Sequence, residues 1–203
     1  MMRKRVLKNL GAVVLLGLPP LLLAACSSGT RVERVAPDEV MDVSGNWNDT
    51  DSRLVAEEMI RDAVAMPWSR RFMEANAGKR PVVIVGRVAN KSAEHINTRT
   101  FVQDIVNTFV RTETARVVSS ADQREQVRDE RWDQQDFASP ETQARLRNEL
   151  GANFMLLGEI NTIFDREGGR EVKFYQVDLN LTDLETNELV WVGQKKIKKF
   201  VQR

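Results

Sequence analysis

Few residues in this chain could carry covalent or acid–base chemistry. His95 is the only histidine and lies in a polar stretch, Ser92 to Asn97. A serine-hydrolase triad would have to use it, and no Gly-x-Ser-x-Gly motif accompanies it. One histidine and one cysteine also make a poor set of zinc ligands. Adjacent carboxylates are plentiful, but they sit on predicted charged helix faces, where solvation is their usual role. We therefore predict a protein that is not an enzyme and holds no metal.

The only cysteine, Cys26, ends a segment that has the parts of a secretory signal. Basic residues between Arg3 and Lys8 precede an apolar run, Leu10 to Leu23, which is interrupted by glycine and proline. A bilayer span needs about 20 apolar residues, more than this run supplies. The sequence Leu-Ala-Ala-Cys resembles the lipobox of bacterial lipoproteins. We expect residues 1–25 to be a lipoprotein signal peptide and Cys26 to carry a diacylglycerol and an N-acyl lipid, with no other cofactor.

Removal of the signal peptide changes the charge of the chain. The whole sequence has a net charge of +1, and residues 1–25 hold four basic and no acidic residues, so the remaining 178 residues have a net charge of −3. Nucleic-acid binding favours a basic face, so we expect no nucleic-acid partner. Ser27 follows the cysteine at the position where inner-membrane retention signals often have aspartate. This points to an outer-membrane anchor that faces the periplasm.

The rest of the chain divides into a tether and one domain. Residues 26–43 are mostly polar and have no hydrophobic period, which predicts a flexible tether. Residues 44–203 have the length of a single globular domain, and the 42% apolar content of the whole sequence fits such a domain. Its elements are predicted in the order α-α-β-α-β-α-α-β-β-β, which indicates an α/β fold with helices packed on a mixed β-sheet and a C-terminal antiparallel meander.

Periodicity and turn residues place these elements. The predicted helices run from near Asp51 to the residue before Pro67, from Pro67 to Ala77, from Thr98 to Glu113, from Ala121 to Trp132, and from Pro140 to the residue before Gly151. The predicted strands are Val82 to Asn90, Ala115 to Ser119, Phe154 to Ile163, Tyr175 to Thr182 and Leu189 to Phe200.

Two features have two interpretations each. The basic run Lys195 to Lys199 fits a solvated edge strand, where lysines block unwanted pairing, or a patch for an acidic partner or an anionic cell-wall polymer. Trp47 precedes the first helix and fits either a residue that pins the start of the domain or one that docks a partner.

Several motifs, in their order and spacing, resemble the LpoB-type outer-membrane lipoprotein activators of class A penicillin-binding proteins. They are the lipobox at Cys26, the segments Asp42 to Ser52, Pro81 to Ser92, Leu150 to Asn153 and Leu184 to Trp191, and the basic run to Lys199. The resemblance implies a fold similar to the N-terminal domain of TolB. It also implies a non-catalytic regulator that docks on an accessory domain of a peptidoglycan synthase. The enteric activators have a long proline-rich linker, whereas residues 26–43 contain a single proline, Pro37.

If this chain is such an activator, its partner-binding surface should consist of exposed polar groups on loops held by the sheet. We predict Asn90, Lys91, Ser92 and Asn97, around the loop after the first strand. The alternative function is that of a structural lipoprotein in an outer-membrane assembly or secretion complex.

Overall fold

The structure is a computed structural model that describes residues 32–146 and 149–202. Residues 32–36 form no helix or strand, and a compact unit begins at Pro37. Cys26 and the predicted signal peptide lie outside the described residues. None of the helices in the described part has the length and apolar character needed to cross a membrane.

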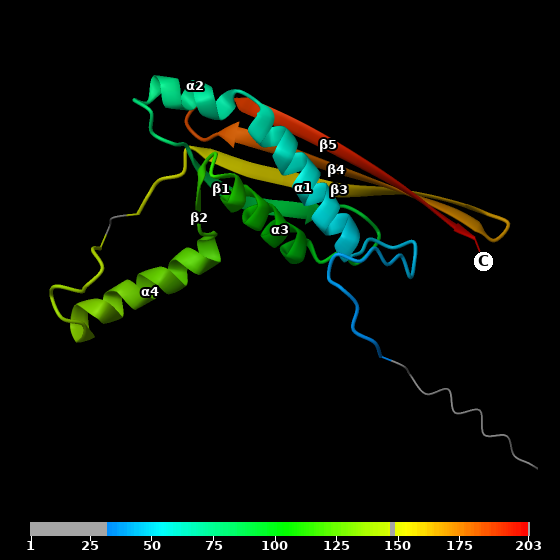
Figure 1. Cartoon of the computed structure of the whole chain (residues 1–203), viewed down its shortest axis with the longest axis horizontal. Coiled ribbons are helices and arrows are strands. Elements are labelled where there is room, and N and C mark those ends of the chain that lie inside the picture. Colours follow the sequence, from blue (N-terminus) through cyan, green and yellow to red (C-terminus); the bar gives the residue numbers. More distant parts are fainter. Residues whose placement is uncertain (1–31, 147–148, 203) are drawn as a thin grey trace, which may run out of the picture. The chain divides into compact units, whose positions relative to one another are not determined.

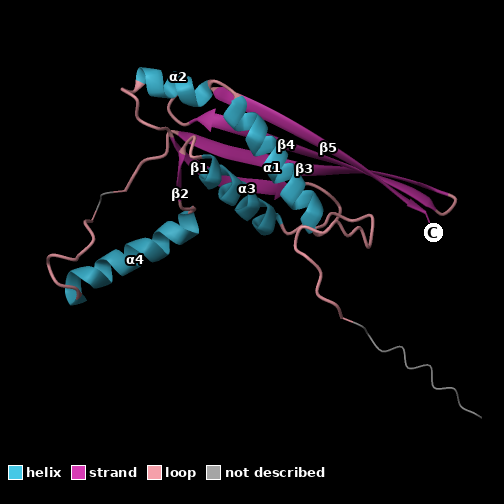
Figure 2. Cartoon of the chain, viewed as in Figure 1, coloured by secondary structure: helices cyan, strands magenta, loops and turns pink. Residues whose placement is uncertain are grey.

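The centre of the fold is a five-stranded mixed sheet in the order β2-β1-β3-β4-β5 (Figures 1 and 2). The strands β1 (Val82–Asn90) and β2 (Arg116–Val118) are parallel, and β1 also runs parallel to β3 (Phe154–Glu167). The strands β3, β4 (Arg170–Asp183) and β5 (Leu189–Gln202) form the predicted antiparallel meander. The predicted α/β class with a mixed sheet is confirmed.

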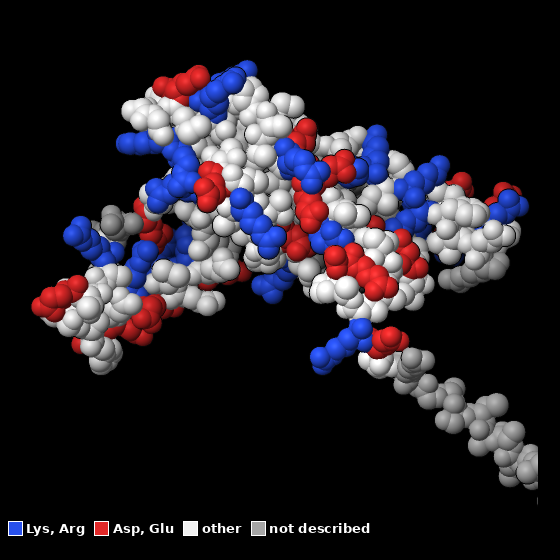
Figure 3. Space-filling view, in the orientation of Figure 1, with Lys and Arg blue, Asp and Glu red and all other residues white. Residues whose placement is uncertain are grey.

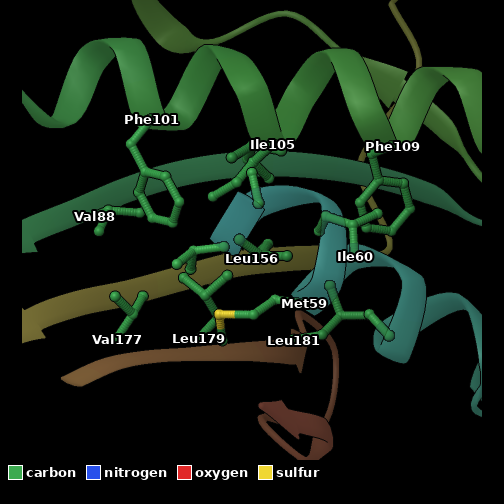
Figure 4. Close-up of a cluster of buried hydrophobic side chains, with 14 of the residues drawn as sticks. Met59, Ile60, Val88, Phe101, Ile105, Phe109, Leu156, Val177, Leu179 and Leu181 are labelled. Carbon is green, nitrogen blue, oxygen red and sulfur yellow. The ribbon is translucent and has the colours of Figure 1, made fainter. Parts of the chain in front are cut away.

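Two long helices and one short helix pack on the same face of this sheet. They are α1 (Asp49–Ala65), α2 (Trp68–Ala75) and α3 (Thr98–Thr112), and Figure 1 shows α1 and α3 lying across the strands. Their apolar side chains and the facing strand residues form one buried cluster. Figure 4 shows Phe101, Ile105 and Phe109 of α3 pointing toward Leu156, Val177 and Leu179 of the sheet. No other described helix packs on the opposite face of β3, β4 and β5, so that face is uncovered.

Alternation along β4 decides which side chains enter the core. Tyr175, Val177, Leu179 and Leu181 are fully buried, and the polar residues between them lie on the uncovered face. This matches the predicted half-buried strand. The turn before β4 is made by Gly168 and Gly169, both with positive φ angles of 54° and 78°, as a tight hairpin requires. The hairpin is longer than predicted, because β3 continues to Glu167.

The prediction of a helix from Pro140 to Gly151 is wrong. The helix α4 (Ala121–Phe137) runs past its predicted end at Trp132, and the described residues between 139 and 150 form only turns. Few large apolar side chains occur in this stretch, so a helix there would have no apolar face to bury. Its polar groups bond to the end of α4 instead: the Gln143 side chain donates to the Ala138 carbonyl at 3.1 Å.

Candidate functional site

The loop of residues 91–97 is held by its own polar side chains. The Asn90 side-chain oxygen accepts hydrogen bonds from Ser92 N at 2.9 Å and Ser92 Oγ at 2.6 Å, and its Nδ2 donates to the Glu94 carbonyl at 2.7 Å. Asn97 caps α3 by accepting from Arg99 N at 3.2 Å. Three of the four predicted partner-binding residues therefore shape the loop itself. Lys91 differs from them because its side chain is exposed and only its backbone N–H is engaged, with the Ile160 carbonyl.

The segment of residues 42–52, called the entry segment below, is fastened to the start of α1. Asn48 and Asp51 form a reciprocal capping box with hydrogen bonds of 3.0 Å in each direction. Trp47 donates from Nε1 to Ser52 Oγ at 2.8 Å. Its ring meets the rings of Phe101 and Tyr175 edge-on, with centroids 6.0 and 5.6 Å apart. Trp47 thus pins the start of the domain, the first of its two interpretations.

Glu94 joins the loop to the entry segment and to β4. Its carboxylate accepts hydrogen bonds from Lys173 Nζ at 2.8 Å, Tyr175 OH at 2.8 Å and Trp47 N at 3.2 Å. The Lys173 ammonium also donates to the Asn46 side-chain oxygen. Burial alone would raise the pKa of Glu94, but the hydrogen bonds from Lys173, Tyr175 and Trp47 outweigh it and hold that pKa below its usual value.

A second ion cluster binds the entry segment to β5. The Lys199 ammonium lies 2.7 Å from a carboxylate oxygen of Asp42 and 2.7 Å from one of Asp51. It also donates to the Asn46 carbonyl at 3.2 Å. Burial opposes the charge on Lys199, yet the hydrogen bonds from Lys199 to Asp42 and Asp51 raise its pKa. Contacts with the domain thus occur before the predicted boundary at residue 44, at Asp42 and already at Asp38, whose carbonyl accepts from Arg53 Nη2 at 3.4 Å. The boundary itself stays a prediction.

The charged and polar groups of these two clusters hold the entry segment, the loop and the strands β4 and β5 together. Tyr175 has a raised pKa, first because it is buried and then because it donates to the Glu94 carboxylate, so its hydroxyl stays protonated. His95 is exposed. Among residues 32–146 and 149–202, no group of three or more His, Cys, Asp or Glu side chains is placed to bind a metal ion. The arrangement fixes the shape of a surface around residues 91–97.

A groove of about 680 Å³ lies between α3, β1, β2 and the start of α4. Its walls combine valines, such as Val102 and Val106, with the polar side chains of Arg87, Arg99 and Gln123. Arg99 lies 3.9 Å from Asp122 across the groove, and both side chains are exposed. Figure 3 shows basic and acidic side chains intermingled on the helix-covered face.

Glu94, Lys173 and Tyr175 were not predicted as one group. Glu94 lies about 80 positions from the other two in the sequence, so no local pattern joins them. One signal was available. The inward-facing positions of β4 continue from Tyr175 back to Lys173 and Glu171, which are both buried charged residues. Charged residues at inward positions of a strand indicate buried counter-charges.

Comparison with known proteins gives one family match. The model of the family described as peptidoglycan-synthase activator LpoB matches residues 51–197. No curated protein matches the chain.

Three solved structures show low similarity. The LpoB C-terminal domain from Salmonella enterica has 14% identity and a TM-score of 0.43, over 73% of this chain and 99% of that one. The NMR structure of E. coli LpoB has 14% identity and a TM-score of 0.41, over 100% of this chain and 96% of that one. Lipoprotein GNA1162 from Neisseria meningitidis has 16% identity and a TM-score of 0.34, over 59% of this chain and 83% of that one.

Proposed function

Because the chain belongs to the peptidoglycan-synthase activator LpoB family, we propose that it binds a class A penicillin-binding protein in the periplasm and activates it without catalysing a reaction itself. The observation that carries this proposal is the family match over residues 51–197, which extends from α1 into β5. Activation by a protein ligand requires that the chain bind the active conformation of the synthase more tightly than the inactive one.

The proposal includes a lipid anchor. Cys26 would carry a diacylglycerol and an N-acyl lipid, and these would hold the chain to the outer membrane, facing the periplasm. The basic, apolar and small residues before Cys26 support this. More than one acyl chain is what makes such an anchor stable.

The loop of residues 91–97 is the best-supported docking surface. The hydrogen bond that Asn90 donates to the loop and the one that Glu94 accepts from Lys173 of β4 fix its shape before any partner arrives. A preformed loop loses little conformational entropy on binding. Lys91 is its exposed cation and is the residue we assign to direct contact with the synthase.

The test measures glycan-chain synthesis by a purified class A penicillin-binding protein with increasing amounts of the lipidated chain. We expect a saturable rise in rate, together with crosslinking of the two proteins in intact cells. An unchanged rate without crosslinking would refute the proposal. Recovery of outer-membrane assembly proteins, with no synthase among them, would support the alternative of a structural lipoprotein.

A further inference from the structure

The two faces of β5 present its lysines differently. Lys195 and Lys199 point to the helix-covered face and pair with carboxylates, Lys195 with Glu58 and Lys199 with Asp42 and Asp51. Lys196 and Lys198 point to the uncovered face and are exposed. Neither has an ion pair among the described residues.

Apolar side chains lie beside these two lysines. In one row across the sheet, Ile163 of β3 is paired with Phe174 of β4, which is paired with Lys198 of β5. In the next row, Val172 is paired with Phe200. Ile163 is 66% exposed and Phe200 is 61% exposed. We call Ile163, Val172, Phe174, Phe200, Lys196 and Lys198 the uncovered patch.

The tether joins the domain next to this patch. Asp42 contacts Lys199, which neighbours Lys198 and Phe200 on the edge strand. Cys26 lies 16 residues before Asp42, a length of roughly 55 Å when fully extended. A lipid at Cys26 therefore keeps Asp42, and with it the edge strand β5, close to that distance from the membrane surface or nearer. The end of the tether and the patch therefore lie on opposite faces of the same edge strand, β5.

We infer that the uncovered patch docks on the lipid surface of the membrane that holds the anchor. This inference rests on the lipidation of Cys26 that is part of the proposed function. Exposed apolar and aromatic side chains enter the headgroup region, and neighbouring lysines are attracted to anionic lipids. Asp165, paired with Val172, and Asp178, paired with Gln194 in the row beyond Lys196, border the patch, so this attraction is confined to the two lysines on β5.

The anchor makes a weak docking surface effective. A patch of six side chains binds lipid weakly when free in solution, but a tether that confines it near the membrane raises its effective concentration. Docking by the uncovered face also leaves the opposite, helix-covered face and Glu94 turned to the periplasm. The lipid surface would then orient the domain as well as hold it.

The experiment relies on the fact that Cys26 is the one cysteine in the sequence. Acylation blocks the thiol of Cys26, so an environment-sensitive fluorophore on Ile163→Cys labels one site only. The lipidated protein is placed in vesicles of phosphatidylethanolamine and phosphatidylglycerol, three parts to one, that contain a nitroxide-labelled quencher lipid. The comparison site is Val110→Cys on α3, which is 53% exposed on the helix-covered side. We expect several-fold stronger quenching at residue 163 than at residue 110.

Charge reversal supplies the matched control. Lys196→Glu with Lys198→Glu should reduce quenching at residue 163. Arg71→Glu with Lys79→Glu, which makes the same charge change near α2, should leave it unchanged. Equal quenching at residues 163 and 110, unaffected by the lysine variants, would overturn the inference. Protection of the label at residue 163 by added synthase, without any lipid quenching, would assign the patch to a protein partner and overturn it too.

Failure of the proposed function is detected separately. The same lipidated protein is assayed for stimulation of the synthase, so stimulation without lipid docking refutes only the inference. A mass spectrum that shows no acyl chain on Cys26 refutes the inference together with the anchor, while stimulation by the chain can still be measured.

Discussion

The Glu94 carboxylate accepts a hydrogen bond from the Lys173 ammonium at 2.8 Å, although 79 positions of sequence separate the two residues. Both side chains are largely buried, with exposed fractions of 13% and 10%. The contact joins a loop to the middle strand of the C-terminal meander. Through Asn46, which also accepts from Lys173, it reaches the entry segment as well.

Replacing Glu94 by alanine should destabilise the fold strongly. The change leaves the buried Lys173 ammonium with only the more distant Glu171 carboxylate, 4.0 Å away. Breaking a buried pair costs about 3–5 kcal/mol, and Glu171 should reduce this loss. Chemical unfolding would measure the loss. The double variant Glu94→Leu with Lys173→Met removes both charges and should regain part of the stability. If Glu94→Ala unfolds at the same denaturant concentration as the parent chain, the pair has no structural role.

Stability should fall in acid. The pKa values of Glu94 and Asp42 lie below their ordinary values of 4.5 and 3.8, because the folded state holds both carboxylates charged. Their contribution is therefore complete above these ordinary values and is lost as the pH falls through the lowered pKa values. Unfolding midpoints measured from pH 7 down to pH 2 would show the decline. In Glu94→Gln the decline should be smaller.

Stability should also fall in strong alkali. Tyr175 and Lys199 both have pKa values raised above their ordinary values of 10.0 and 10.5. Each therefore stabilises the fold fully below its ordinary value, and that contribution is lost as the pH rises through the raised one. Tyr175→Phe removes the ionisable hydroxyl and should make the alkaline decline shallower above pH 10. A decline that is unchanged in this variant would contradict the assignment to Tyr175.

Loss of the N-cap of α1 should cost less stability than loss of the buried pair of Glu94 and Lys173. Asn48→Ala removes the side chain that accepts from Asp51 N, and loss of such an N-cap costs about 1 kcal/mol. Asn48→Ser retains a capping oxygen and should lose much less stability. Thermal unfolding followed by circular dichroism would distinguish the two variants, and equal melting temperatures would argue against the cap.

Two glycines should respond differently when a methyl group is added. A Cβ on Gly158 would lie 2.5 Å from the Asp178 carbonyl oxygen, a backbone atom of the neighbouring strand. Gly158→Ala should therefore disturb the pairing of β3 with β4 and lower the unfolding midpoint. A Cβ on Gly151 would have no atom within 4 Å. Gly151→Ala, the matched control, should leave the midpoint close to that of the parent chain.

Lys91 and Asn90 should separate binding from stability. Lys91→Glu changes an exposed side chain and should weaken stimulation of the synthase without changing the melting temperature. Asn90→Ala removes the hydrogen bonds that shape the loop, so it should lower both. Loss of stimulation in Asn90→Ala alone would show that Lys91 makes no direct contact.

Local patterns predicted the elements that have a strong period or clear end signals. The alternation from Tyr175 to Leu181 predicted the face that β4 buries. The start predicted near Asp51 lies within a few positions of the N-cap that the structure shows, Asn48. The Ser139-Pro140 pair looked like a helix start of the same kind. It failed because a start signal does not form a helix without an apolar face to bury.

The site could be predicted only in part. The presence of a loop after β1 was predicted and its binding role stays a prediction, but its most connected residue, Glu94, looked like an ordinary surface carboxylate beside the lone histidine. Its importance comes from Lys173 and Tyr175 on a distant strand. The basic run of β5 was ambiguous in sequence because alternate lysines face opposite sides of the sheet, and the structure pairs only those on the helix-covered side.

The fastening of the entry segment also determines where mechanical load enters the domain. A pull on the tether reaches Asp42 and then passes to Lys199 on β5 and, through Asn46, to Lys173 on β4. These strands are hydrogen-bonded to each other along almost their whole length, so the force is spread over many backbone bonds. Resistance to pulling depends on how fast such contacts break. The ion pairs of Lys199 with Asp42 and Asp51 would then be among the contacts that break early when the tether is pulled.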